Sequence, residues 1–456
     1  MIESGDRVAE LDRMSETLPA DDGAAAETPS ARRSRSTFWT RRFPPFTPRQ
    51  WRVFGISTTA GFFDNYDSAL LSLAIKQIQR SLGVAEANLG NMLSAIRLGY
   101  LASFLISPLA DVFGRRRLLL YTIVGYTVLT GLSAIAPHQR SFVAAQFLAR
   151  AFSGAEATLS IVILAEEVDA AGRGWALGMQ GALAISGYGL AALVFGAIAI
   201  IPYGWRGLYM IALLPLAVIV PLRRILPESR RFESEAASGL RPTGVVQPIA
   251  ELFRVYPGRL MITVAVWFLY AMSVSSAGFF VPKYLQEAHH WLPRRVSLLY
   301  VLGGAIGILG NIVAGRTSDH FGRRTMGALF ILAEAGLAWW LYTSRSNAVI
   351  SVWVLWLFCD QAAITILNAY SAELFPTSSR AAAGSALSVA RYGGGALGLF
   401  LEGVLYGLVG SHWTAIRYLT IFWFLAAAAM YLLFPETAGR ELEEIAPDAS
   451  PGVLKR

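Results

Sequence analysis

Long apolar runs alternate with short polar links along most of the chain. A helix that crosses a bilayer needs about 20 mainly apolar residues. Backbone polar groups in lipid must pair within their own segment, so these runs predict transmembrane helices. We expect twelve of them, at 51–75, 89–110, 117–136, 142–165, 174–200 and 206–226, and then at 259–283, 297–315, 325–343, 348–372, 381–408 and 414–434.

The last six runs repeat the first six at a nearly constant offset. Asp111 and Asp319 are 208 residues apart, and each opens a stretch that ends in Phe-Gly-Arg-Arg. Two further landmarks recur in the same order: Glu166 with Arg173 returns as Glu373 with Arg380, and Pro227-Glu228-Ser229 returns as Pro435-Glu436-Thr437. A fixed period indicates duplicated units. The sequence therefore predicts an all-α membrane protein with twelve transmembrane helices in two six-helix pseudo-repeats.

This repeat divides the chain into five segments. We expect a cytoplasmic tail at 1–45, which lacks an apolar core and has a disordered composition. A six-helix bundle at 46–226 follows, and a cytoplasmic linker at 227–258 joins it to a second six-helix bundle at 259–436. Residues 437–456 form a second cytoplasmic tail.

Charge supports this topology. The chain is 54% hydrophobic and only 15% charged, against roughly 25% charged in an ordinary soluble domain. Most of the 39 Lys and Arg residues lie in the two tails and in the links after even-numbered runs. Positive charge marks the cytoplasmic side, so we expect an inner-membrane protein with both termini cytoplasmic. No single basic patch suggests nucleic acid as a partner.

Several charged residues interrupt the apolar runs of the first half. Asp64 and Asp67 are three residues apart and share one helix face. With a rise of about 1.5 Å per residue, Asp64, Arg97 and Arg150 fall at similar depth, and Glu156 follows Arg150 on the same run. Such charges usually mark an ion or substrate path. Two alternatives are that the acids are interfacial, because the first helix ends early, or that the charges form a purely structural ion pair.

The second half does not copy these charges and has its own set, namely Glu334, Asp360, Arg391 and Glu402. We therefore expect the duplicated charges to serve architecture and gating, and the others to serve ligand and ion. All five histidines lie in links or at helix ends, so a carried proton should use a carboxylate. Cys359 is the single cysteine and is expected to be a small core residue, with no disulfide and no zinc site. No nucleophile, metal cluster or cofactor loop indicates an enzyme, so no cofactor is expected.

At the duplicated motif the chain resembles the major facilitator superfamily, along residues 46–446. The superfamily signature is matched in the second copy by Gly315, Asp319, Gly322, Arg323 and Arg324. The first copy has Asp111, Gly114, Arg115 and Arg116, with Ser107 where the first glycine is expected. The serine is expected to loosen a close helix contact there. The resemblance implies that these residues, with Glu166, Arg173, Glu373 and Arg380, form cytoplasmic charge relays that hold an outward-open state. It also implies a substrate site near the midplane between the halves.

Other stretches resemble the branch of sugar porters and metabolite–proton symporters. These are Glu373-Leu374-Phe375-Pro376 and Pro435-Glu436-Thr437-Ala438-Gly439-Arg440. The seventh run lacks the glutamine pair of sugar porters, and the tenth lacks their proline and tryptophan. The stretch Asp64-Asn65-Tyr66-Asp67 looks more like the Asp-Gly-Tyr/Phe-Asp of aromatic-acid symporters, with Asn65 replacing the glycine.

We therefore expect a monomeric secondary transporter that works by alternating access, with protons, a small-molecule substrate and the lipid bilayer as its partners. The leading hypothesis is proton-coupled uptake of a small organic acid. The candidates for proton coupling are Asp64, Asp67 and Glu156, and those for substrate binding are Tyr66, Arg97, Arg150, Tyr270, Asp360 and Arg391, with Trp267 and Trp356 flanking. A proton-coupled drug or metabolite exporter, a sugar transporter of the same fold and a non-transporting membrane sensor are the alternatives.

Overall fold

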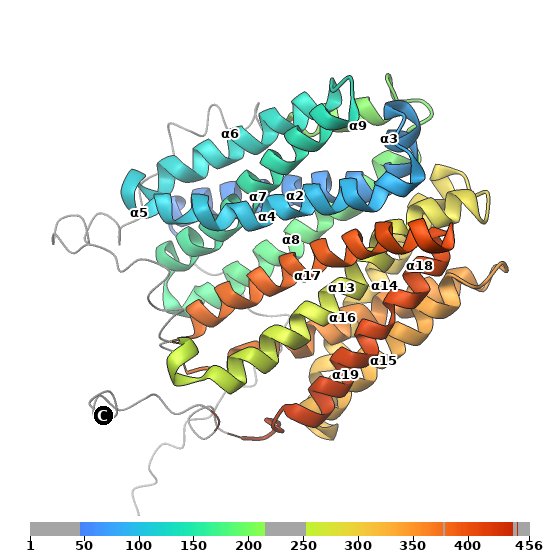
Figure 1. Cartoon of the computed structure of the whole chain (residues 1–456). Coiled ribbons are helices and arrows are strands. Elements are labelled where there is room, and N and C mark those ends of the chain that lie inside the picture. The colour runs from blue at the N-terminus through green and yellow to red at the C-terminus, as the bar shows by residue number, and fades with distance from the viewer. Residues whose placement is uncertain (1–45, 215–251, 377–378, 441–444, 446–456) are drawn as a thin grey trace, which may run out of the picture. The chain divides into compact units, whose positions relative to one another are not determined.

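The chain folds into helices, and the residues that the structure describes contain no strand (Figure 1). The structure is a computed structural model and describes residues 46–214, 252–376, 379–440 and 445. We call residues 46–214 the first half and residues 252–440 the second half. The helices of the first half are α2 (Pro48–Leu73), α3 (Ile75–Leu82), η2 (Glu86–Asn88), α4 (Leu89–Ile106), η3 (Ser107–Leu109), α5 (Ala110–Phe113), α6 (Arg115–Ala134), α7 (Gln139–Glu167), α8 (Ala170–Gly196) and α9 (Trp205–Ile211).

The second half begins its long helices at Pro257. They are α13 (Pro257–Glu287), α14 (Pro293–Phe321), α15 (Arg323–Leu341), α16 (Val349–Glu373), α17 (Arg380–Val409), α18 (His412–Leu419) and α19 (Ile421–Leu433). Each predicted run contains at least one helix, although only the start of the sixth lies among the described residues. Within those residues, nine helices are long and apolar enough to cross a membrane. The predicted all-α membrane fold is confirmed.

Parts of the predicted segments lie outside the described residues. They include the whole tail 1–45, residues 227–251 of the linker and most of the tail 437–456. The boundaries of the five segments therefore stay predictions.

Local sequence signals fix where the helices begin. Thr47 caps α2, because its hydroxyl accepts a bond from the Gln50 amide, while the Gln50 side chain accepts one from the Thr47 amide. Pro48 occupies the first helical position, where its missing N–H costs nothing. Gly114 and Gly322 precede α6 and α15 with φ of 91° and 93°. Only glycine adopts this backbone readily, so both copies of the motif end in the same sharp turn.

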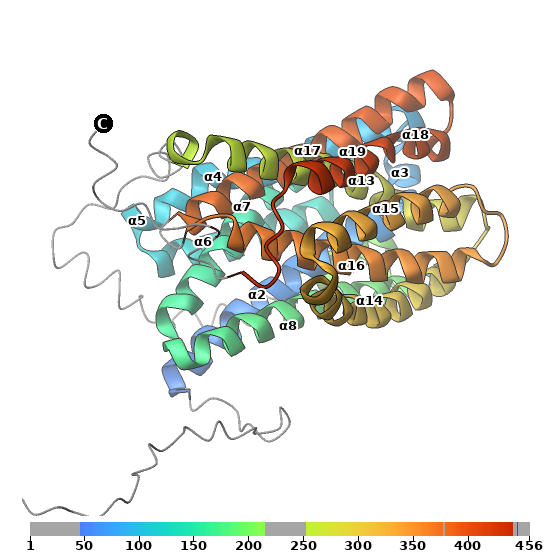
Figure 2. The same ribbon diagram turned by 90° about the horizontal axis from the view of Figure 1, so that it is seen from below.

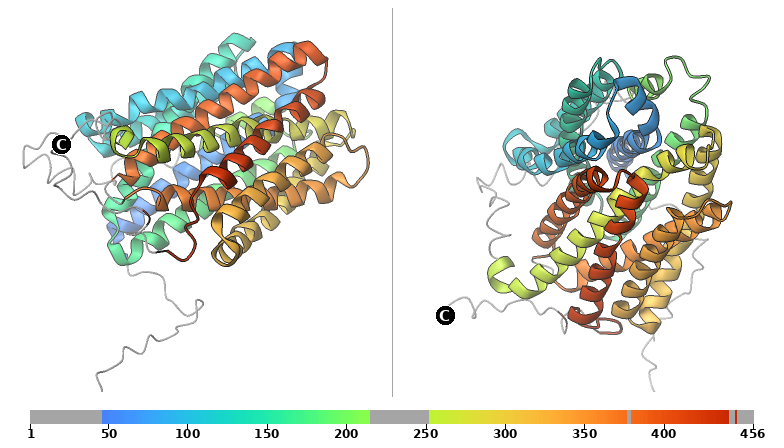
Figure 3. Two further views of the ribbon diagram at one scale, coloured as in Figure 1. Left: turned by 60° about the horizontal axis from the view of Figure 1, so that its bottom comes forward. Right: turned by 45° about the vertical axis from the view of Figure 1, so that its right-hand side comes forward.

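The two halves are built by the same packing scheme, as the 208-residue repeat predicts. In the first half α2 packs on α8, α4 on α7, and α6 on α7. In the second half α13 packs on α17, α14 on α16, and α15 on α16. Figures 2 and 3 show the blue-to-green helices of the first half grouped apart from most yellow-to-red helices of the second.

The halves meet along two helix pairs, α4 with α17 and α8 with α14. Small residues allow close approach at both pairs. A Cβ on Gly90 of α4 would lie 2.5 Å from the Gly403 amide nitrogen and 2.6 Å from the Leu399 carbonyl oxygen of α17. A Cβ on Gly196 of α8 would lie 2.8 Å from the Ser297 hydroxyl of α14.

The polarity of the fold is suited to lipid. Large apolar side chains face outward: Leu105 and Leu408 are 78% exposed and Ile200 is 84% exposed. Carboxylates lie inside instead, and Glu156 and Glu402 are 0% exposed. Burying charge while exposing leucine is the arrangement of a bundle surrounded by hydrocarbon.

The bundle has two ends that differ in chemistry. We call the end that carries Arg115 and Arg323 the arginine end, on the side of α5 in Figure 1. The opposite end carries Glu86 and His412, and we call it the histidine end. Between described residues, all hydrogen bonds that join the two halves lie at the histidine end, for example from Ser72 Oγ to the Phe279 carbonyl at 3.0 Å. The halves are therefore closed together at that end.

Candidate functional site

A buried ion pair lies inside the first half. Arg150 Nη1 of α7 lies 3.0 Å from Asp67 Oδ2 of α2 and donates to Ser68 Oγ at 2.9 Å. Arg150 Nη2 donates to the Gln146 side chain at 3.1 Å and to the Asp67 carbonyl at 3.3 Å. The sequence offered both Asp64 and Asp67 as partners for an arginine at this depth. In the structure Arg150 forms its ion pair with Asp67.

Asp64 lies near this pair, and Glu156 lies near Asp64. Asp64, one helical turn before Asp67, is half-buried and accepts a hydrogen bond from Ser153 of α7. Glu156 is fully buried and accepts a bond from Ser160 at 2.6 Å. Glu156 Oε2 has no hydrogen-bond partner. The structure thus brings together all three carboxylates predicted for proton coupling, and only Asp64 among them keeps substantial exposure.

Arg97 takes no part in this ion pair and lies at the contact between the halves. Its Nε atom is buried without a hydrogen-bond partner, and no ion pair joins Arg97 to another described residue. Tyr100 follows one turn later on α4 and stacks on Tyr392 of α17, with ring centroids 4.7 Å apart and planes 7° apart. This stack is an aromatic contact between the two halves.

The second half has its own acidic cluster. The Tyr270 hydroxyl of α13 contacts Asp360 Oδ1 of α16 at 2.9 Å and Glu334 Oε1 of α15 at 3.1 Å. Gln361 donates to Asp360 Oδ2 at 3.1 Å. A hydroxyl donates only one hydrogen, so both contacts form together only when one acid is protonated and donates to the phenol oxygen.

The remaining candidates for substrate contact are more scattered. Arg391 of α17 is exposed and lies over the Trp267 ring at 5.9 Å. The Trp267 indole donates to Ser371 Oγ at 3.0 Å. Trp356 is buried against two other tryptophan rings. Tyr66 is 0% exposed and donates to the Leu208 carbonyl of α9, so the structure does not bring it toward the other candidates.

The duplicated motif forms matching contacts at the arginine end. Arg115 pairs with Glu166 in the first half, and Arg323 pairs with Glu373 at the corresponding place in the second. Arg323 also lies 3.1 Å from Asp319. Glu436, from the repeated Pro-Glu stretch, accepts bonds from the backbone amides of Arg323 and Arg324.

The other motif residues are less engaged. Arg173 is exposed, and Arg380 Nε is buried without a hydrogen-bond partner. The side chain of Asp111 lies outside the described ones. The expectation of a close helix contact at the first motif glycine is wrong for this conformation, because a Cβ on Gly315 meets nothing within 4 Å. Ser107 in the first copy therefore loosens no contact of that kind.

A charged network at the histidine end was not predicted. Glu86 Oε2 of the first half lies 2.9 Å from His412 Nε2 and 3.0 Å from Lys283 Nζ, both of the second half. His412 Nδ1 contacts Glu402, and Lys283 Nζ also donates to Glu287 Oε1 at 3.0 Å. Glu402, one of the charges found in the second half alone, therefore belongs to this network. No sequence signal could have found this network, because Glu86 and His412 are 326 residues apart and lie at the ends of different helices.

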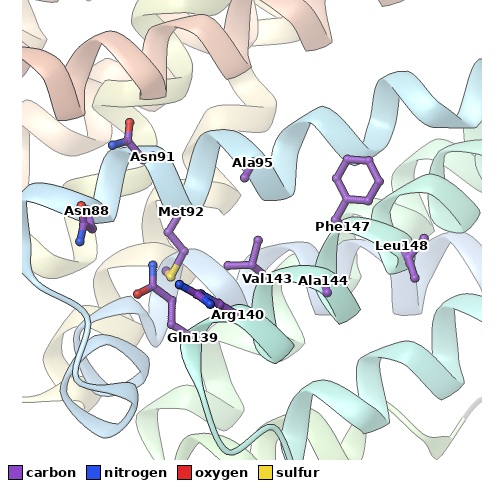
Figure 4. Close-up of a pocket in the computed structure, with 10 residues that line it drawn as sticks. All are labelled: Asn88, Asn91, Met92, Ala95, Gln139, Arg140, Val143, Ala144, Phe147 and Leu148. Atoms are coloured by element: carbon purple, nitrogen blue, oxygen red, sulfur yellow. The ribbon is translucent and has the colours of Figure 1, made fainter.

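Figure 4 shows a cavity of about 500 Å³ between the starts of α4 and α7. Met92, Val143 and Phe147 give it a mostly apolar lining, and Arg140 lies at one side. None of the predicted site residues lines it. It belongs to the surface of the first half rather than to the contact between the halves.

Nothing in the described part of the chain suggests a bound metal. No group of three or more His, Cys, Asp or Glu side chains among those residues is arranged to hold one. Cys359 is buried, as expected for a small core residue. The site chemistry therefore rests on arginines, carboxylates and aromatic rings.

Comparisons with known proteins agree with this architecture. The profile of the Major Facilitator Superfamily matches residues 58–399 and, in a second match, 268–454. The 4-hydroxybenzoate transporter PcaK of Pseudomonas aeruginosa is 25% identical over 423 residues, which cover 85% of this chain and 93% of that protein. The niacin transporter NiaP of Acinetobacter baylyi is 25% identical over 414 residues, covering 84% and 93%.

The fold also matches solved structures. The xylose transporter XylE from E. coli, in its inward open conformation, superposes with a TM-score of 0.69. The match covers 87% of this chain and 99% of that one, at 19% sequence identity. At this identity the likeness shows the fold alone.

Proposed function

The chain belongs to the Major Facilitator Superfamily, a family of membrane transporters and not of enzymes, and on that premise we propose that it imports a small organic acid together with protons. It works by alternating access in the inner membrane. The observation that carries this proposal is the set of three buried or half-buried carboxylates on α2 and α7 of the first half, of which Asp67 pairs with Arg150.

Asp64 is the proposed proton carrier. Asp67 already forms an ion pair with Arg150, and the Glu156 side chain is fully buried. Asp64 is half-buried beside Ser153 and one turn from the ion pair, so protons reach it while the field of Arg150 still acts on it. Neutralising Asp64 changes the charge balance of the cluster, which is the kind of event that biases a two-state transporter.

An aromatic carboxylate is the proposed substrate class. The two relatives compared above are named for niacin and 4-hydroxybenzoate, and both molecules carry a carboxyl group on a planar ring. Arginines on two helices, Arg97 and Arg391, lie without an ion pair to other described residues. A guanidinium group binds carboxylates through paired hydrogen bonds.

We further propose that the arginine end is cytoplasmic and that its ion pairs form the inner gate. The links that hold Arg115 and Arg323 are rich in arginine, and the positive-inside rule assigns such links to the cytoplasmic side. The histidine-end network then forms the outer gate, and the present conformation faces the cytoplasm. Single cysteines at exposed positions, in a Cys359→Ala background, test this orientation. Asp319→Cys should react with a membrane-impermeant maleimide only after the cells are opened, whereas Asn347→Cys should react in intact cells.

The function is tested in proteoliposomes with a trapped pH-sensitive dye. Addition of nicotinate or 4-hydroxybenzoate outside should acidify the lumen, and Asp64→Asn should abolish this while the protein stays folded. The matched control is Asp169→Asn, at the exposed position before α8, because the asparagine oxygen can still accept the bond from Gln50. Acidification that persists in Asp64→Asn would remove Asp64 from the proposal.

The same assay separates import from export. If neither nicotinate nor 4-hydroxybenzoate acidifies the lumen, although the protein is folded and inserted, proton-coupled import of these acids is overturned. Substrate-dependent proton movement from liposomes loaded with drugs or metabolites would then support an exporter. A sugar panel tests the remaining alternative.

A further inference from the structure

Arg97 occupies an unusual place at the contact between the halves. It projects from α4 onto α17, where a Cβ on Gly395 would collide with its Nε and lie 2.9 Å from its Cζ. The Ser275 hydroxyl of α13 lies 2.6 Å from the same point. A guanidinium group of the first half and a hydroxyl of the second half therefore both lie next to Gly395, where no side chain separates them.

Both polar groups are left without partners. Arg97 Nε and Ser275 Oγ are buried and form no hydrogen bond, and Ser275 is only 5% exposed. The charged side chains that face Arg97 are Arg150 and Arg391, which are also cations. A buried polar atom without a partner costs free energy, and an uncompensated charge costs more. We call the place where Arg97 and Ser275 meet over Gly395 the niche. Its unpartnered donors and its positive charge are the chemistry of a site that binds an anion.

Arg150 provides an internal comparison. Its guanidinium group is shared among Asp67, Ser68 and Gln146, so little of its bonding capacity remains. Arg97 makes no such bonds to described residues and is half-buried rather than enclosed. The hydrogen bonds that an anion needs are thus available at Arg97 and already used at Arg150.

An aromatic surface borders the niche. Tyr100 lies three residues after Arg97, and Tyr392 lies three residues before Gly395, so each tyrosine shares a helix face with its neighbour in the niche. The two rings stack across the interface at 4.7 Å. A planar ring next to a guanidinium group matches the shape and charge of an aromatic carboxylate.

We propose that Arg97 and Ser275 together bind the carboxylate group of the substrate, beside the rings of Tyr100 and Tyr392. Gly395 keeps the niche open, because any larger residue would fill it. The proposal rests on the proposed function and specifies its substrate site. Since the two ligating groups come from different halves, a bound carboxylate ties the halves together at the centre of the bundle.

The test compares each acid with its neutral amide on the purified full chain. Nicotinate and nicotinamide, and 4-hydroxybenzoate and its amide, have nearly the same shape but differ in charge. By isothermal titration calorimetry we expect the wild-type protein to prefer the acids by about tenfold or more, the scale of a hydrogen bond to a charged group. Arg97→Gln should abolish that preference, and Arg97→Lys should restore part of it.

Two variants probe the niche without removing charge. Ser275→Ala should weaken acid binding by a few-fold, on the order of one neutral hydrogen bond. The matched control is Ser276→Ala on the same helix, because the Ser276 hydroxyl is already bonded to the Met272 carbonyl at 2.9 Å and should not affect binding. Gly395→Ala should weaken binding of acid and amide alike, and it keeps the test valid if Arg97→Gln fails to fold.

The outcomes distinguish this site from the function as a whole. Nicotinate binding that is unchanged in folded Arg97→Gln or in Gly395→Ala would overturn the site, while proton uptake by the wild-type protein would still support import. If the wild-type protein binds neither acid, the aromatic carboxylate site is overturned. Proton-coupled transport of other compounds would then be judged by the dye assay alone.

Discussion

Arg150 Nη1 lies 3.0 Å from Asp67 Oδ2, and each of these two residues is only 2% exposed. This pair crosses from α7 to α2 and closes a set of bonds that includes Ser68 and Gln146. Each charge compensates the other in a place where water does not. Asp64, one turn away, is not part of the pair and stays half-buried. The two acids of α2 should therefore respond differently to the same substitution.

We predict that Asp67→Asn destabilises the protein far more than Asp64→Asn. Removing Asp67 leaves Arg150 as a buried, uncompensated cation, and breaking a buried pair in this way costs about 3–5 kcal/mol. Asp64→Asn keeps the pair, and the asparagine oxygen still accepts the bond from Ser153. Thermal unfolding in detergent, followed by tryptophan fluorescence, measures the difference.

The double variant Asp67→Asn with Arg150→Gln provides the control. It removes both charges, so it should regain much of the stability lost in Asp67→Asn while remaining inactive in transport. Equal melting temperatures for Asp67→Asn and Asp64→Asn would contradict the assignment of Arg150 to Asp67.

The sequence predicted that acids of α2 meet an arginine of the first half, but not which ones. Spacing places Asp64 and Asp67 on one helix face and gives the depth of Arg97 and Arg150. It does not give the rotation of one helix about its axis relative to another. That rotation turns Arg150 toward α2 and Arg97 toward α17, and it is set by packing across the whole bundle.

The two motif glycines of the second half should differ in their tolerance to a side chain. Gly322 has φ of 93°, and a Cβ there would lie 2.6 Å from Glu436 Oε2, which accepts a bond from the Arg324 amide. Gly322→Ala should therefore cost about 1–3 kcal/mol. Gly315→Ala, where a Cβ meets nothing within 4 Å, should be nearly neutral to stability. Thermal unfolding of the two variants, side by side, tests this, and a larger loss for Gly315→Ala would contradict it.

We predict that removing the Tyr270 hydroxyl lowers the rate of transport. Its hydroxyl is the common partner of Asp360 and Glu334, and its loss leaves two buried carboxyl groups with one bond fewer. We expect Tyr270→Phe to lower initial uptake by about tenfold, equivalent to about 1.4 kcal/mol. The control is Tyr284→Phe, which loses a bond to the Ser344 carbonyl outside this cluster. Equal uptake by both variants would separate Tyr270 from transport.

The histidine-end network could not be predicted from the sequence. The 208-residue repeat predicted two matching halves, and the family resemblance implied charged contacts among the duplicated motif residues at the arginine end. Glu86 and His412 are 326 residues apart and have no counterparts in the repeat. Each reads as an ordinary polar residue at the end of a helix. Only the closing of the two halves brings them within 2.9 Å.

Locking the histidine end should stop transport. Gln77 Nε2 of the first half lies 2.7 Å from Gln286 Oε1 of the second, so cysteines at these positions come within reach of a short bis-methanethiosulfonate reagent. In a Cys359→Ala background, cross-linked Gln77→Cys/Gln286→Cys should lose uptake, because alternating access requires this end to open. Reduction should restore it.

The control is Arg295→Cys/Asn347→Cys, at two positions of the second half where Arg295 Nη2 lies 3.1 Å from Asn347 Oδ1. This pair should cross-link without loss of uptake. Full uptake by the cross-linked Gln77–Gln286 pair would mean that this end does not open during transport.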